Sequence, residues 1–112
     1  MKPDESRSAA SAPAAKLAHA FDEAMLQIYM RAKNEAGYSA TRFYQMLHDH
    51  GGVETARRLL PQMSEGFTQL WQRNRLDLTV EWLVLEQRWH ALFSQAERDT
   101  ARQRLLECGA NI

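Results

Sequence analysis

The sequence predicts an all-α protein, a single compact bundle of five or six short helices (residues 16–112) that follows a disordered N-terminal tail (residues 1–15). Three observations support this prediction. Apolar residues recur every three or four positions along most of the chain, which is the helical period. Capping residues and glycines stand at the ends of these periodic segments. The length of 112 residues, with 45% hydrophobic and 25% charged residues, fits one soluble globular domain.

The chain opens with a segment that is poorly suited to a core. Residues 1–15 are rich in Ser, Ala and Pro and hold few large apolar side chains, so burial cannot offset the entropy of ordering. After this segment, one helix face carries apolar residues in steps of four, four, three and four. A first helix is therefore expected at about residues 14–36, with Gly37 just beyond its end. The apolar residues of this face are Leu17, Phe21, Met25, Ile28 and Ala32.

Three shorter helices are expected next, packed on the first. Ser39 can cap the first of them, which ends at Gly51-Gly52. Residues 53–60 form a second amphipathic stretch, which a proline stops. Ser64 can cap the third, in which Gly66 weakens the first turn.

The stretch LDLTVEWLVLE, residues 76–86, fits both a strand and a helix. Alternate residues are apolar, as in a strand, yet leucines and tryptophans also recur at helical spacing. A strand would need a partner strand, and the sequence holds no second convincing alternating run. A helix at about Leu78–Arg88 is therefore expected, with Asp77 or Thr79 as its cap.

The last expected helix has the strongest local signal. SQAE, at Ser94–Glu97, is a capping box, in which the Ser hydroxyl and the Glu carboxylate each accept a backbone N–H of the other residue. An apolar stripe of Ala101, Leu105 and Cys108 follows. Gly109 stands where a glycine commonly ends a helix.

The helix expected at residues 78–88 is apolar on most sides, which leaves two interpretations open. One is a fully buried central helix of the bundle. The other is a helix that faces both the core and a partner, because Trp is enriched where interfaces concentrate their energy. A homodimer is the simplest such partner, since a two-fold patch needs only one gene. The candidate partner-contact residues are Trp71, Leu78, Trp82, Leu85 and Trp89.

The charge balance argues against nucleic-acid binding without excluding it. The chain has 14 basic and 14 acidic residues and a net charge of zero, whereas nucleic-acid-binding domains are usually strongly basic. Two helices joined at Gly51-Gly52 resemble a helix-turn-helix, but a plain helical hairpin explains them equally and is favoured. The candidate anion or nucleic-acid patch comprises Arg57, Arg58, Arg73 and Arg75.

The sequence offers no set of residues for catalysis or metal binding. His48 and His50 are two positions apart, so on a helix they point to different faces. Cys108 lies at the end of a helix, whereas helix N-termini are the ends that stabilise thiolates. We therefore expect a protein that is not an enzyme and that has no cofactor. No apolar run is long enough for a membrane span, and no secretory signal is recognisable, so no membrane contact and a cytoplasmic location are expected.

Much of residues 21–106 resembles a family of small uncharacterised bacterial helical proteins. The resemblance rests on GYSATRF, HGGVETARRLL, GFTQLW and RLDLTVEWLVLE, and it leaves residues 1–15 out. It implies a bacterial, cytoplasmic and helical protein, and it brings no activity or site residue with it. The function expected from all these features is a non-catalytic protein-interaction module, a small subunit or regulator that self-associates in the simplest case. The alternative is a nucleic-acid-binding accessory protein that uses the four arginines, and a catalytic or small-molecule-binding domain ranks last.

Overall fold

Every regular element in the described part of the chain is helical. The computed structural model describes the backbone of residues 3–112 and the side chains of residues 14–112. It contains five α-helices and two short 3-10 helices, which confirms the predicted all-α class. In chain order they are α1 (Pro3–Ala36), α2 (Thr41–Leu59), α3 (Glu65–Gln72), η1 (Leu76–Leu78), α4 (Val80–Val84), η2 (Gln87–Leu92) and α5 (Gln95–Glu107).

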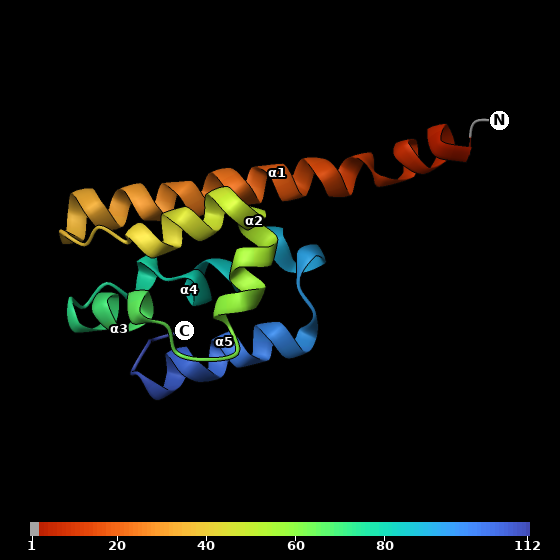
Figure 1. Ribbon diagram of the computed structural model, residues 1–112. Helices are drawn as coiled ribbons and strands as arrows, with labels where there is room; N and C mark the ends of the chain where they lie inside the picture. The colour runs from red at the N-terminus through yellow and green to blue at the C-terminus, as the bar shows by residue number, and fades with distance from the viewer. Residues whose placement is uncertain (1–2) are drawn as a thin grey trace.

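Helix α1 packs against α2, η1, α4 and η2, whereas α5 packs on α4 and α3 on η1. Helix α1 is 34 residues long and begins at Pro3, earlier than the predicted start at about residue 14. Figure 1 shows α2 lying along its C-terminal half, while its first turns project beyond the rest of the molecule. Its end is as predicted: Gly37 has a φ of 69°, and the Tyr38 N–H donates to the Ala32 carbonyl at 3.0 Å. The predicted tail, residues 1–15, falls largely on residues whose side chains are not described, so its disorder stays a prediction.

Helix α2 is kinked where the sequence predicted a boundary between two helices. Gly51 has a φ of 79° and a ψ of 171°, which are not helical values. The next residue, Gly52, donates its backbone N–H to Asp22 Oδ1 of α1 at 2.6 Å. A Cβ atom at Gly52 would lie 2.8 Å from that oxygen, so only glycine allows this close approach. The predicted Ser39 cap is wrong, because the helix begins later, after Ala40, and has no side-chain cap.

The apolar stretch at residues 76–92 forms three short pieces in place of the single predicted helix. Thr79 caps α4 by accepting the Trp82 N–H at 3.2 Å, as one of the two predicted caps. The helix then ends at Val84, with Leu85 as its C-cap, because Glu86 is extended (φ −64°, ψ 134°). This break turns the chain so that the Trp89 ring packs edge-on against Phe21 of α1 at 5.2 Å between centroids. The prediction of one continuous helix over Leu78–Arg88 is therefore wrong, and burial of Trp89 accounts for the break.

The core is formed by buried side chains of α1, α2, α4, η2 and α5. Helix α4 is central to it, since Val80, Leu83 and Val84 are all buried. The other buried side chains include Phe21, Met25, Trp89, Phe93, Ala101 and Leu105. Helix α5 begins with the predicted capping box, with Ser94 Oγ 3.1 Å from the Glu97 N and Glu97 Oε1 2.8 Å from the Ser94 N. None of the helices in the described residues has the length and apolar character needed to cross a membrane.

Candidate functional site

The five residues predicted to contact a partner do not form one surface. Leu78 and Trp89 are buried in the core, with 1% and 2% of their surface exposed, so they contact other parts of the same chain. Trp82 and Leu85 are half-buried. Trp71, on α3, is 43% exposed and is the one member of the set with a large accessible surface. For most of residues 78–92 the structure thus supports the interpretation as core.

Arg57 and Arg58 of the predicted anion patch are engaged within the chain. Arg57 Nε lies 3.1 Å from Glu97 Oε2, and its Nη2 donates to the Leu92 carbonyl at 2.9 Å. Arg58 Nε lies 2.9 Å from Glu54 Oε2 on the same helix. Each guanidinium therefore has a carboxylate beside it, which reduces its attraction for a phosphate.

Arg73 and Arg75 are engaged with the far end of α1. Arg73 donates to the Ala36 carbonyl at 3.0 Å and stacks over the Tyr38 ring at 5.3 Å. Arg75 lies 2.7 Å from Glu35 and 3.0 Å from Asp77. Hydrogen bonds from Arg31 and Arg75 lower the pKa of Glu35 to about 2.

The two arginine pairs lie along different parts of α1, so the predicted patch is not assembled. Arg57 lies over the Phe93 ring, which packs against Phe21, whereas Arg75 contacts Glu35. Phe21 and Glu35 are separated by about 21 Å along α1, given the helical rise of about 1.5 Å per residue. The four arginine side chains therefore do not form one surface that a nucleic acid could contact.

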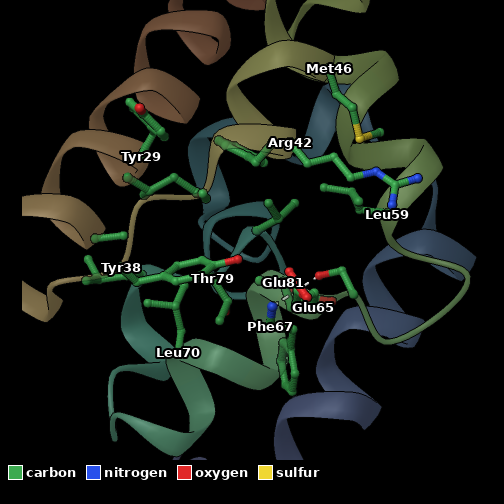
Figure 2. Close-up of a pocket in the computed structure, with 18 of the residues that line it drawn as sticks. Tyr29, Tyr38, Arg42, Met46, Leu59, Glu65, Phe67, Leu70, Thr79 and Glu81 are labelled. Atoms are coloured by element: carbon green, nitrogen blue, oxygen red, sulfur yellow. Dashed lines mark hydrogen bonds between the residues drawn. The ribbon is translucent and has the colours of Figure 1, made fainter.

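The most prominent candidate site is a cavity of about 390 Å³ between α1, α2, α3 and the η1–α4 segment. Figure 2 shows side chains from all of these elements converging on it. Exposed Arg42, Arg58 and Glu65 stand among the lining residues, and Tyr38, Thr79 and Glu81 supply polar groups with little exposure. The apolar wall is formed mainly by Ile28, Phe43, Met46, Leu59, Phe67 and Leu70. Apolar walls with a few placed polar groups are typical of binding sites of this size.

Glu81 is the charged group at the buried wall of this cavity. It is 1% exposed, and its Oε2 accepts a hydrogen bond from Arg104 of α5 at 2.7 Å. Burial raises the pKa of Glu81, while Arg104 and the backbone N–H of Glu81 itself oppose that change. One member of a buried ion pair therefore borders the cavity.

Sequence reasoning did not single out Glu81 or the cavity. One signal was present: Glu81 is an acid at the start of a segment whose neighbours Val80, Leu83 and Val84 are all apolar. A carboxylate in such a position needs a buried partner. That partner, Arg104, is 23 positions away and was not recognisable without the fold.

The histidines and the cysteine do not add a second site. His48 and His50 are both exposed on α2. Cys108 is half-buried, and burial raises the pKa of its thiol, which disfavours the reactive thiolate. Within the described residues, no group of three or more His, Cys, Asp or Glu side chains is placed to hold a metal ion.

Fold and cavity together define a small all-α domain with a cavity that apolar and polar side chains both line. Comparisons with family models, with curated proteins and with solved structures gave no match. The function is therefore inferred from the site itself.

Proposed function

We propose that this protein is a non-catalytic protein-interaction module, and that its cavity receives an anchor side chain of the partner. The observation that carries this proposal is the cavity. Its interior combines apolar side chains with the buried Thr79 and Glu81, and exposed charged residues stand at its border. Protein interfaces have this arrangement, with a few anchor side chains in desolvated pockets inside a polar rim.

The groups around the cavity suit binding better than catalysis. A hydrolytic or transfer site needs a nucleophile, a base within hydrogen-bond reach and a group that orients the base. The lining contains two carboxylates, of which Glu81 is already paired with Arg104, and it contains no His, Cys or Lys. Thr79, the most enclosed hydroxyl of the lining, donates to the Leu76 carbonyl and caps α4.

The exposed residues beside the cavity are of types that favour contact with another protein. Met63 is 46% exposed and lines the cavity together with Arg42, Arg58 and Glu65. Met is adaptable at binding surfaces, and Arg is enriched in interface anchors. The mixed charge of this border favours a partner that also carries both signs, and it does not favour a polyanion such as nucleic acid.

A matched pair of substitutions at Gly66 tests the proposal. Gly66 lines the cavity, and a Cβ atom there would meet Ser64 Oγ at 3.8 Å and Tyr38 Cε2 at 4.0 Å, which is ordinary contact. Gly66→Leu should fill part of the cavity, and Gly66→Ala is its control with the same backbone effect. Partners captured from the native cell by the wild type and by Gly66→Ala should be lost with Gly66→Leu. Capture of the same partners by all three proteins would contradict the proposal.

Self-association is the simplest form of the interaction, and it has its own measurement. Sedimentation velocity over a hundredfold range of concentration detects a dimer directly. If the wild type and Gly66→Ala dimerise and Gly66→Leu does not, the partner is a second copy of this chain. A monomer at all concentrations would exclude self-association through the cavity.

A further inference from the structure

We propose that α1 binds the α1 helix of a second copy of this chain in antiparallel orientation, through an exposed stripe of residues. None of the stripe residues lines the cavity, so this surface is separate from the site of the proposed function. The spacing of the stripe, its apolar centre and the placement of its charges all support this pairing. The stripe consists of His19, Glu23, Leu26, Met30, Lys33 and Gly37.

The stripe has the spacing of a seam between two paired helices. Its residues follow one another in steps of four, three, four, three and four, the repeat that keeps one face of a helix turned toward a partner helix. All six residues are exposed, and Figure 1 shows the other helices lying on one side of α1. Within the described side chains, the chain itself therefore leaves this face of α1 uncovered.

The centre of the stripe is apolar. Leu26 and Met30 are 42% and 44% exposed, and residues four positions apart are neighbours on a helix surface. Tyr44 of α2 is also exposed, and its ring centroid lies 4.9 Å from that of Tyr29, so it extends the apolar surface beside α1. Single exposed apolar side chains are common on soluble proteins, whereas a cluster of large ones marks a contact surface.

Opposite charges flank this apolar centre at equal distances. Glu23 and Lys33 are separated by about 15 Å along α1, given a rise of about 1.5 Å per residue, so they cannot pair with each other. Among the described side chains, Lys33 forms no ion pair, and Glu23 has only His19, at 3.4 Å. Residue 28 lies midway between Leu26 and Met30 and also midway between Glu23 and Lys33. The stripe is therefore symmetric about residue 28 in its apolar residues and opposite in its charges.

This symmetry favours a second copy of the chain as the partner, and it sets the direction of the pairing. In an antiparallel helix pair with its two-fold axis at residue 28, positions equidistant from the axis face each other. Leu26 then meets the second copy's Met30, and Glu23 meets the second copy's Lys33, at both ends. A parallel pair would place Glu23 against Glu23 and Lys33 against Lys33, and such like charges are unfavourable.

Charge reversal tests this pairing by sedimentation velocity. Over a range of concentration that reaches millimolar, the wild type should form a dimer. Glu23→Lys and Lys33→Glu each place like charges at both ends of the seam, so each should weaken the dimer by about tenfold or more. The double variant Glu23→Lys/Lys33→Glu exchanges the two charges and should restore the wild-type affinity. An equal mixture of the two single variants should also dimerise, because each variant then meets opposite charges.

Matched variants separate the seam from general effects of charge and folding. Lys16→Glu makes the same change of charge at an exposed residue of α1 that precedes the stripe, and it should leave the dimer unchanged. Leu26→Gln and Met30→Gln retain helix propensity but make the centre polar, so each should weaken the dimer. Because all these residues are exposed, thermal unfolding at a concentration where the wild type is monomeric should give similar midpoints for every variant.

A strict monomer at millimolar concentration would overturn the antiparallel pairing of α1. So would a dimer that both charge reversals leave unchanged, or one that the double variant fails to restore. The cavity is tested separately, because Gly66→Leu should leave the α1 dimer intact. A dimer that is lost with Gly66→Leu and retained with Lys33→Glu would contradict the α1 seam and support the proposed function.

Discussion

The Arg104 guanidinium of α5 and the Glu81 carboxylate of α4 form an enclosed ion pair, with a distance of 2.7 Å between Nη1 and Oε2. The two side chains are 11% and 2% exposed. The pair joins the central helix to the last helix, and Glu81 also borders the cavity. A pair in this position links the stability of the core to the chemistry of the candidate site.

Removing one partner of this pair should lower the free energy of unfolding far more than replacing both partners. Arg104→Met leaves a buried carboxyl without its partner, and such changes typically cost about 3–5 kcal/mol. The double variant Glu81→Met/Arg104→Met should lie within about 1–2 kcal/mol of the wild type, because apolar side chains of similar volume replace the pair. Urea denaturation measures both free energies of unfolding. Similar losses in the single and double variants would show that the pair is not an enclosed unit.

The three tryptophans should differ in their effect on stability. Trp89→Ala removes a buried ring that packs on Phe21, and its expected cost is about 3–5 kcal/mol. Trp71→Ala removes an exposed ring and should change the free energy of unfolding by less than about 0.5 kcal/mol. Trp82 is half-buried, so Trp82→Ala should cost an amount of stability between these two values. A large loss with Trp71→Ala would mean that α3 packs differently from the structure.

Two glycines should respond to alanine in opposite directions. Gly52→Ala places a Cβ atom 2.8 Å from Asp22 Oδ1 and 3.2 Å from the Asp22 Cα, so it should destabilise the protein by about 1–3 kcal/mol. Gly66→Ala meets no close contact inside α3, and it should stabilise by about 0.5–1 kcal/mol through helix propensity. Thermal unfolding of the two variants beside the wild type gives the sign of each effect. A Gly52→Ala variant as stable as the wild type would contradict the close approach at Gly52, and a destabilised Gly66→Ala variant would contradict the open space at Gly66.

The pairing of Glu35 should contribute to acid sensitivity. Arg31 and Arg75 lower the pKa of Glu35 from 4.5 to about 2. A carboxyl with a lowered pKa in the folded state stabilises the protein above the unfolded pKa, and this contribution is lost as the pH falls toward the folded pKa. The window is therefore about pH 4.5 to 2. Carbon-detected NMR titration should find the low pKa, and Arg75→Met should raise it. Because the Glu35 side chain is 41% exposed, added salt should weaken the effect.

Much of the helical framework was determined by the sequence by itself, because it depends on neighbours in the chain. The apolar face that begins at Leu17 and the glycine at position 37 predicted the buried side and the end of α1, and both are confirmed. The capping box at Ser94 and the Ser64 cap were equally local, since a capping hydroxyl and its N–H are three residues apart.

The rest was decided by the tertiary structure, because it depends on contacts between residues far apart in the chain. The break after Leu85 leaves no local signal such as Gly or Pro, and it follows from the packing of Trp89 on Phe21, 68 positions earlier. The four arginines looked alike in the sequence, yet Arg57 binds the Glu97 carboxylate of α5 and Arg75 binds the Glu35 carboxylate of α1. The cavity and the Glu81–Arg104 pair exist only once α1, α2, α3, α4 and α5 are assembled. Periodicity shows which face of a helix is buried, but the partner that a buried charge finds there is set by how the helices pack.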